Sequence, residues 1–249
     1  SKGIPTFIHE ANSFAGKSNI LLGKKATKIF VATPGMERFF PKENLLVSGN
    51  PVRTAIENNY LSRKDALAHF NLDDAKITIL AVGGSLGAAS SNNALMEHLG
   101  VFENNNLQLI WQTGKTNADL YKNAAASYKN IWIDSFITQM EYGYAAADIV
   151  ISRAGAMAVT ELCVSGKAAV LVPFPFAAED HQTANAMQLV NNGAAKIIKD
   201  ADAQSLLVKT ILALSANPME QENMKAQLRK MALRNAAEFI ANQILASLS

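Results

Sequence analysis

Nine short apolar runs, separated by segments with helical periodicity, constrain the fold of this 249-residue chain most strongly. Runs such as "KITILAV" and "AAVLVPF" are continuously apolar, which is typical of strands buried on both faces of a parallel sheet. About ten to fifteen residues separate most of the runs, the spacing expected of βαβ units. The pattern predicts an α/β protein with a Rossmann-like, doubly wound parallel sheet. The other runs are "IPTFI", "KIFVA", "NLLVSG", "LQLIWQ", "NIWIDSF", "DIVIS" and "AAKII".

A Gly-Asn-Pro break in "VSGNPVR" divides the chain into two parts. We expect residues 1–52 to be the end of one Rossmann-like domain and residues 53–225 to be a complete second one. Residues 226–249 are expected to form a C-terminal helix that packs back toward the first domain. The chain enters a strand-like run almost at once and has no initiator Met, so we expect the N-terminal part of the first domain to be missing. The apolar stripe of the last helix would be Leu233, Ala237, Ile240, Ile244 and Leu248.

Composition narrows the class of protein. The net charge is +2 and there are no long Lys/Arg runs, which argues against nucleic acid as a partner. Cys163 is the only cysteine, so no internal disulfide can form. With no signal peptide visible, we expect a cytoplasmic setting. The longest apolar stretch, "AAVLVPFPFAA", is too short to span a bilayer and contains two prolines.

The glycine-rich stretch "AVGGSLGAASSN" follows a predicted strand and leads into a predicted helix. Gly83, Gly84 and Gly87 would let the backbone approach an anion, and the Ser85 hydroxyl adds a donor. The spacing matches neither the dinucleotide-binding fingerprint nor the P-loop. We therefore predict a phosphate loop, with glycines required only by the turn as the alternative.

A second stretch, "SRAGAMAVTEL", places a small-residue loop between a strand and a helix that begins near Ala156. The Glu161 carboxylate could accept hydrogen bonds from both hydroxyls of a ribose. The alternative is a solvated glutamate on a helix surface.

Polar residues also follow other strands. The stretch "AAEDHQTANA" gathers polar residues, among them Gln182 and Asn185, at the edge where open α/β sheets bind ligands. Asp180 in this stretch could equally be a simple N-cap, and His181 an exposed surface histidine. In "FIHEANSF", His9 could act as a general base, or it could pair with Glu10 and only organise the loop. Arg53 could hold a phosphate or be a surface charge.

Taken in order, the motifs resemble those of the MurG family of N-acetylglucosaminyltransferases, which make the lipid-linked disaccharide precursor of peptidoglycan. The resemblance runs from residue 4 to the terminal helix. The motifs are "IHEANSFAGKSNILLGKKATKIFVATPG", "GNPVR", "GGSLGA", "RAGAMAVTEL" and "VPFPFAAEDHQTANA".

The resemblance implies a GT-B fold, with residues 53–225 as the donor-binding domain and residues 1–52 as the end of the acceptor-binding domain. It implies inverting transfer of N-acetylglucosamine from UDP-N-acetylglucosamine to the 4-hydroxyl of undecaprenyl-pyrophosphoryl-N-acetylmuramoyl-pentapeptide. This chain alone would bind the donor and be inactive. The family works at the cytoplasmic face of the inner membrane, which it meets through the missing N-terminal domain.

The resemblance also assigns roles to single residues. Ser85, assisted by Arg53, would meet the diphosphate, and the backbone of Ile137 would contact the uracil. Glu161 would bind the ribose hydroxyls. Gln182 and Asn185 would lie near the sugar, and Asn12 would reach the donor across the cleft. The residues around the nucleoside would be Ala156, Met157, Ala158, Val159, Thr160 and Glu161. Three positions depart from common family residues: Ala158 replaces Thr, while His181 and Ala11 replace Gln.

No cofactor or metal is implied, because no Asp-x-Asp pair stands where it could hold a divalent ion. Backbone amides, a helix end and Arg53 would stabilise the charge of the departing UDP instead. The base would be His9 or a histidine of the missing part. Two other functions stay open: a stand-alone nucleotide-sugar-binding subunit of a split glycosyltransferase, or a UDP-sugar epimerase, which would need catalytic carboxylates from both domains.

Overall fold

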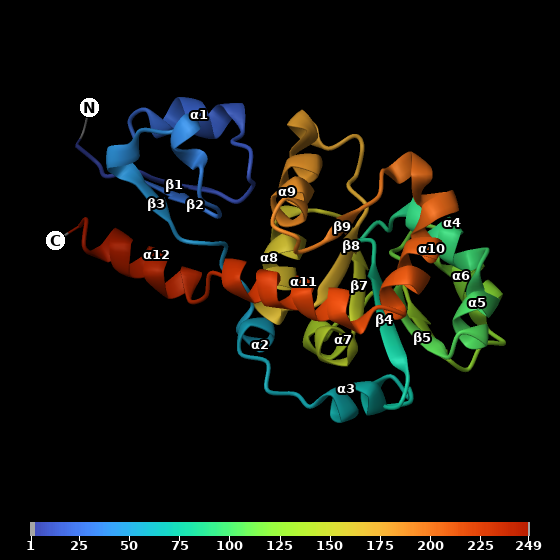
Figure 1. The fold of residues 1–249 in the computed structure, drawn as a ribbon. Helices are drawn as coiled ribbons and strands as arrows, with labels where there is room; N and C mark the ends of the chain where they lie inside the picture. The colour runs from blue at the N-terminus through green and yellow to red at the C-terminus, as the bar shows by residue number, and fades with distance from the viewer. Residues whose placement is uncertain (1–2, 249) are drawn as a thin grey trace.

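The computed structural model describes residues 3–248, which form a small unit and a larger one (Figure 1). The small unit is a three-stranded parallel sheet in which β2 lies between β1 and β3. Ile29 and Val31 of the central strand are fully buried and pack with Met36 and Phe40. Its elements are β1 (Phe7–Glu10), α1 (Lys17–Gly23), β2 (Lys28–Val31), η1 (Met36–Arg38), η2 (Lys42–Asn44) and β3 (Leu45–Val47).

The larger unit is a six-stranded parallel sheet in the order β6-β5-β4-β7-β8-β9. This is the doubly wound order, and each of the nine predicted runs contains or overlaps a strand. The four central strands are buried on both faces, which explains why their sequences are apolar without alternation. The strands are β4 (Ile77–Val82), β5 (Leu107–Gln112), β6 (Ile131–Asp134), β7 (Ile149–Ser152), β8 (Ala168–Leu171) and β9 (Lys196–Ile197).

Helices cover both faces of this sheet and create two cores. Successive residues of β4 face opposite cores: Ile79 packs with α4, α5, α6 and α10, and Leu80 packs with α3, α7, α8 and α9. The helices are α2 (Thr54–Glu57), α3 (Arg63–His69), α4 (Ala89–Met96), α5 (Leu99–Asn104), α6 (Ala118–Ala125), α7 (Met140–Ala146), α8 (Ala156–Ser165), η3 (Ala178–Asp180), α9 (His181–Val190), η4 (Asp200–Asp202), α10 (Ala203–Ser215), α11 (Pro218–Met231) and α12 (Ala236–Leu245).

The winding of the sheet reverses between β4 and β7. These strands are neighbours, with Val82 opposite Ser152, so the loops that follow them leave the same edge at the same level. From there the chain continues to β5 and β6 on one side and to β8 and β9 on the other. Such a switch point creates a crevice at the carboxyl edge of the sheet, where doubly wound folds bind ligands.

The C-terminal segment differs from the expected single helix over residues 226–249. The structure has two helices here, because Ala232 is extended with ψ of 121° and ends α11, and α12 begins only after Asn235, which is left-handed with φ of 57°. The first, α11, packs on α8 and β8 of the larger unit. The second, α12, reaches the small unit, where Lys28 Nζ donates to Gln243 Oε1 at 2.7 Å.

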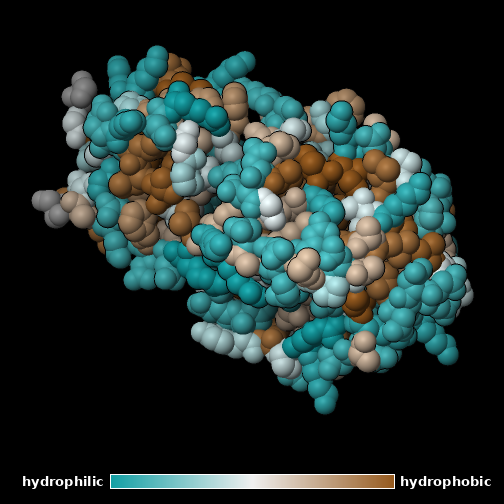
Figure 2. Space-filling model, viewed as in Figure 1, coloured by the Kyte–Doolittle hydropathy of each residue, from teal (hydrophilic) through white to brown (hydrophobic). Residues whose placement is uncertain are grey.

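Apolar side chains of α12 remain exposed at the surface. Leu245 and Leu248 are 64% and 60% exposed, and Figure 2 shows hydrophobic surface where α12 lies beside the small unit. Among residues 3–248, no helix combines the length and the apolar character needed to cross a bilayer.

Candidate functional site

Two helices begin at the switch point without side-chain caps. The N-cap residues of α4 and α8 are Ala88 and Gly155, and neither provides a capping side chain. The N–H groups of a first helical turn have no acceptor within their own helix. These donors, together with the positive ends of two helix dipoles, are available to an anion in the crevice.

The glycine loop before α4 has a steric explanation for two of its glycines. A Cβ on Gly87 would lie 2.2 Å from the Thr113 carbonyl oxygen, and one on Gly83 would lie 2.5 Å from the Ala88 nitrogen. A Cβ on Gly84, whose φ is +80°, would meet no atom within 4 Å. Packing of the turn therefore requires Gly83 and Gly87, whereas Gly84 and Ser85 form the exposed part of the loop.

Gln112 connects this loop to the predicted uracil contact. Its buried side chain donates from Nε2 to the Gly84 carbonyl at 3.3 Å and accepts at Oε1 from the Ile137 N–H at 3.0 Å. The Ile137 side chain is buried, so only its backbone carbonyl is left for a ligand. The sequence patterns did not single out Gln112. The available signal was a polar residue at the end of an otherwise apolar strand.

Glu161 lies half-way along α8 and is not a solvated surface residue: its side chain is only 15% exposed. Tyr144 of α7 donates its hydroxyl to Glu161 Oε2 at 3.0 Å. Burial, followed by the charge of Glu161, raises the pKa of Tyr144 well above its usual value, so the hydroxyl stays a donor. Glu161 Oε1 lies 3.6 Å from Arg53 Nη2. This oxygen is therefore held toward Arg53 by a weak contact that a ligand hydroxyl can replace.

Arg53 lies at this position and not against the glycine loop. Its side chain is 56% exposed, and its ion pair within residues 3–248 is with Glu161. Arg53 and Ser85 were expected to bind the same diphosphate, but no hydrogen bond joins them among residues 3–248. We therefore place Arg53 at the Glu161 end of the crevice.

Asn185 and Asn12 join the two units. Asn185 is buried and donates from Nδ2 to Asn12 Oδ1 and to the Ala154 carbonyl, both at 3.1 Å. Its Oδ1 accepts from the Ser13 N–H at 2.8 Å. All three bonds are to protein atoms, so the amide of Asn185 links the small unit to the loop before α8. We call this set of three hydrogen bonds the Asn185 clasp.

Replacing Asn185 with Ala should destabilise the chain by roughly 2–4 kcal/mol, because three hydrogen bonds are lost and their buried partners are left unpaired. Urea unfolding measures this change. Asn192→Ala is the matched control, since the Asn192 side chain is exposed and bonds only to a carbonyl of its own helix. Equal stability losses for the two variants would contradict the clasp.

Two further predicted residues also hold loops in place. Gln182 Oε1 accepts from the Ala154 N–H at 3.2 Å and from the Phe174 N–H at 3.0 Å, so it joins the loops after β7 and β8. Its Nε2 has no hydrogen bond to residues 3–248 and is free for a ligand. Thr160 faces the small unit, where its hydroxyl accepts from Asn50 at 2.9 Å.

Arg153 also organises the switch point, and the sequence patterns did not single it out. Its Nη1 donates to Asp200 Oδ1 at 2.5 Å and to the Val172 carbonyl at 3.0 Å. The same guanidinium approaches Ser90 at the start of α4. Arg153 thus fixes the ends of β7 and β8 relative to α4.

In the small unit, Glu10 organises the loop that follows β1. Its carboxylate accepts from the Asn12 and Gly16 amides and from the Asn19 side chain. Burial alone would raise the pKa of Glu10, but these hydrogen bonds outweigh it and hold the pKa below its usual value. His9 donates from Nε2 to the Gly49 carbonyl at 3.1 Å, so only Nδ1 could accept a proton.

A cavity of about 420 Å³ lies between the two units. Thr33 and Gly49 line it from the small unit, and Thr160, Cys163 and Gln188 line it from the larger one. Burial raises the pKa of the Cys163 thiol to about 12, so it is not a nucleophile at neutral pH.

Comparison with known proteins agrees with this geometry. Residues 78–240 match the model of the glycosyltransferase family 28 C-terminal domain. A protein of Parabacteroides distasonis is 44% identical over 98% of this chain, which covers 67% of that protein. One of Phocaeicola vulgatus is 44% identical over 97% of the chain, which covers 65% of it. Both are named UDP-N-acetylglucosamine–N-acetylmuramyl-(pentapeptide) pyrophosphoryl-undecaprenol N-acetylglucosamine transferase.

Solved structures give the same result. The crystal structure of Acinetobacter baumannii MurG is 33% identical, with a TM-score of 0.77, and the match covers 98% of this chain and 67% of that one. A UDP-N-acetylglucosamine 2-epimerase is 16% identical, with a TM-score of 0.56 over 90% of this chain and 58% of that one, and therefore shares the fold alone.

The doubly wound sheet and its switch point are those of a glycosyltransferase of the GT-B type. More narrowly, the chain belongs to the MurG family of N-acetylglucosamine transferases, as the sequence motifs predicted. It spans about two thirds of the length of the curated relatives it matches.

Proposed function

We propose that the chain binds UDP-N-acetylglucosamine in the crevice at the carboxyl edge of the six-stranded sheet. The diphosphate would lie against the uncapped starts of α4 and α8, with Ser85 as an additional donor. Glu161 would accept hydrogen bonds from the ribose hydroxyls, and the Ile137 carbonyl would accept one from the uracil. The sugar would extend toward Gln182, whose Nε2 is free to donate.

The observation that carries this proposal is the largely buried Glu161 carboxylate. One of its oxygens is fixed by Tyr144 and the other has only a long contact with Arg53. A carboxylate held in this way can accept bonds from two adjacent hydroxyls, as a ribose provides. Arg53 lies at the same end, so we propose that it contacts the nucleoside and not the diphosphate.

We propose that the family's reaction follows from this arrangement. The muramoyl 4-hydroxyl attacks the anomeric carbon in a single inverting displacement, and UDP leaves with its charge stabilised by fixed amide dipoles. The attacking hydroxyl must lose its proton to a base. His9 Nδ1 is the candidate within this chain, and the alternative lies in the part of the relatives that this chain does not cover.

The acceptor and the cellular location belong to the same proposal. Residues 1–52 would be part of the acceptor-binding domain, which in the whole protein would meet the lipid-linked muramoyl-pentapeptide. We place the protein at the cytoplasmic face of the membrane. Residues 53–225 would be the donor-binding domain, and this chain by itself would bind the donor without transferring the sugar.

The two alternatives make different demands. An epimerase would need catalytic carboxylates from both units. In the small unit, however, the Glu10 carboxylate accepts hydrogen bonds from its own loop. A stand-alone donor-binding subunit would bind the same ligand, and would gain transferase activity only with a separate partner chain. Adding a purified acceptor-domain fragment of a relative tests this point.

Titration calorimetry with UDP-N-acetylglucosamine, UDP and NAD tests the proposal. We expect both uridine nucleotides to bind and NAD to bind far more weakly, because the glycine loop lacks the dinucleotide-binding spacing. With a soluble acceptor analogue added, we expect no release of UDP. Tighter binding of NAD than of UDP-N-acetylglucosamine would overturn the assignment.

A further inference from the structure

A second pocket lies at the opposite edge of the six-stranded sheet. Its lining residues precede the strands: Arg63 lies before β4, Ala145 before β7, and Lys167 immediately before β8. The carboxyl-edge crevice is formed by loops that follow the same strands. Because all the strands are parallel, the two sites open at opposite edges of the sheet. Tyr144 lines this pocket, and its hydroxyl donates to Glu161 Oε2, so Tyr144 lies between the two sites. The pocket has a volume of about 440 Å³.

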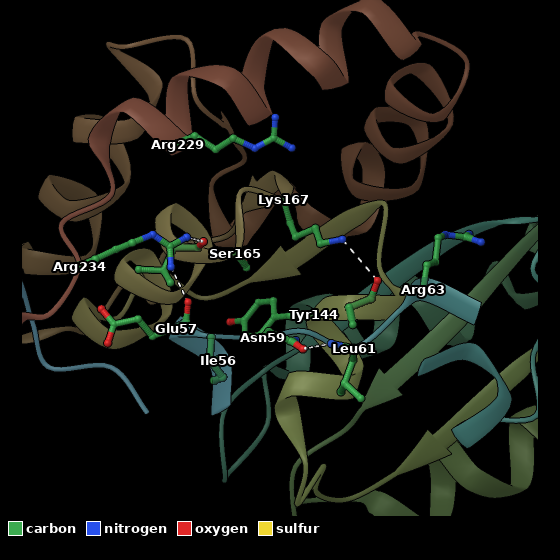
Figure 3. A pocket seen from close by; sticks show the side chains of 12 residues that line it. Ile56, Glu57, Asn59, Leu61, Arg63, Tyr144, Ser165, Lys167, Arg229 and Arg234 are labelled. Carbon is green, nitrogen blue, oxygen red and sulfur yellow. Dashed lines mark hydrogen bonds between the residues drawn. The ribbon is translucent and has the colours of Figure 1, made fainter. Parts of the chain in front are cut away.

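Positive charge converges on this pocket from separate elements. Figure 3 shows Lys167, Arg229 of α11 and Arg234 around one cavity, with Arg63 at its far side. Arg63 is neutralised by Asp74 at 2.6 Å and Asp148 at 2.9 Å. Within residues 3–248, the other three cations form no ion pair. The one carboxylate among the lining residues is Glu57.

Capping of helix ends accounts for only part of this charge. Arg234 donates to the Val164 carbonyl at 2.7 Å near the end of α8, and Lys167 donates to the Ala145 carbonyl at 3.4 Å near the end of α7. Arg234 also donates to the Glu57 carbonyl at the end of α2. A helix C-terminus carries about half a negative charge, so three helix ends and the Glu57 carboxylate do not use up the donors of three cations. The guanidinium group of Arg229 makes no hydrogen bond with any residue that the structure describes.

The environment of Lys167 is unfavourable for a charge in the unliganded chain. The pKa of Lys167 is lowered to about 8, mainly by burial and also by Lys225, Arg63 and Arg229, against the opposing effect of Asp148. An anion bound in the pocket would raise the pKa of Lys167 again, because it would be a counter-charge close to the ammonium group.

We propose that this pocket is a second anion-binding site, separate from the donor crevice, which takes the phosphate group of a small phosphate ester. Arg229 and Lys167 hold the phosphate, because guanidinium binds its oxygens in pairs and ammonium acts as a point charge. The apolar side chains of Ile56 and Leu61 line the same cavity and leave room for the organic part of the ester.

Calorimetric titration with sulfate tests the site, in chloride-free buffer with UDP at saturation to block the donor crevice. Sulfate is used because it keeps its two charges across the pH range. We expect saturable binding that weakens at least about tenfold in Arg229→Gln and in Lys167→Met. Lys209→Gln on α10 is the matched control and should bind sulfate like the unchanged chain.

The outcomes separate this site from the proposed function. Absence of saturable binding, equal affinity in Arg229→Gln, or competition by UDP would each overturn the inference. UDP affinity should be the same in Arg229→Gln and in the unchanged chain. If UDP does not bind but sulfate does, the donor proposal fails and the second site stands.

The pH dependence gives an independent readout. Sulfate affinity should fall as pH rises through about 8, because Lys167 loses its proton there in the unliganded chain. In Lys167→Met this dependence should disappear. Removing a disfavoured charge should not lower the unfolding temperature, so a loss of binding in this variant is distinguishable from unfolding. A flat profile in the unchanged chain would remove Lys167 from the site.

A lipid headgroup presents the same chemistry as a free phosphate ester, and sedimentation with vesicles distinguishes the two sources. Phosphatidylglycerol vesicles that bind the unchanged chain but not Arg229→Gln would identify the lipid as the source of the phosphate. Saturable sulfate binding without vesicle binding would identify a free ester. Either result supports the site.

Discussion

Replacing Glu161 with Gln is expected to weaken UDP binding by roughly 10- to 100-fold. A hydrogen bond to a charged group contributes about 1.5–3 kcal/mol, and about 1.4 kcal/mol corresponds to a factor of ten. The substitution keeps the size of the side chain, and its amide oxygen can still accept from Tyr144. The effect should therefore arise from the lost carboxylate and not from a collapsed crevice. Calorimetric titration with UDP measures it.

The matched control is a ligand without the ribose hydroxyls. Dideoxy-UDP should bind the unchanged chain and Glu161→Gln with nearly equal affinity, because the interaction removed by the variant is absent from the ligand. Arg53→Gln separates the two members of the ion pair and should weaken both ligands alike if Arg53 contacts the base of the nucleoside. If Glu161→Gln binds UDP as tightly as the unchanged chain does, Glu161 is not a ribose ligand.

The strands could be predicted from the sequence because of where they lie. A parallel strand covered by helices on both faces has to be apolar throughout, so "ITILAV" and "AVLVPF" were recognisable without knowledge of their neighbours. The positions of the motifs followed from the same reasoning, since polar loops after parallel strands meet at one edge. The doubly wound order then brought the loops after β4 and β7 together.

What the sequence did not reveal depends on contacts between distant residues. The burial of Glu161 results from Tyr144 on another helix and from Arg53 beyond the break between the units. Asn185 has a polar side chain in a loop region where ligands bind, and the sequence therefore indicated a ligand contact. In the structure, all three of its side-chain hydrogen bonds are made to protein atoms.

Two further features could not be predicted from the sequence: the local backbone conformation between α11 and α12, and the gathering of positive charges in the second pocket. The apolar periodicity of residues 226–249 continues across the break between α11 and α12, so it does not reveal that residues 232–235 leave the helical conformation. The cationic pocket is assembled from Lys167, Arg229 and Arg234, which belong to different elements, so no local motif could indicate it.

Replacing Gly87 with Ala is expected to destabilise the chain by roughly 3 kcal/mol, through strain at a positive φ combined with a clash. The φ of Gly87 is +91°, and the new methyl group would lie 2.2 Å from the Thr113 carbonyl oxygen. Backbone lies on both sides of this contact, so relief requires the loops after β4 and β5 to separate. Urea unfolding measures the loss, and UDP binding should be lost as the loop moves.

Gly84→Ala distinguishes a loop shaped only by its own packing from one that faces a phosphate. Its φ is +80°, so alanine should cost about 1 kcal/mol of stability, but the added methyl group meets no protein atom. If the diphosphate lies against this loop, the methyl group occupies space that the phosphates need. UDP affinity should then fall by more than the small stability loss explains, because the folded population remains high. Unchanged UDP affinity in Gly84→Ala would mean that the glycines serve the turn alone and that the phosphates bind elsewhere.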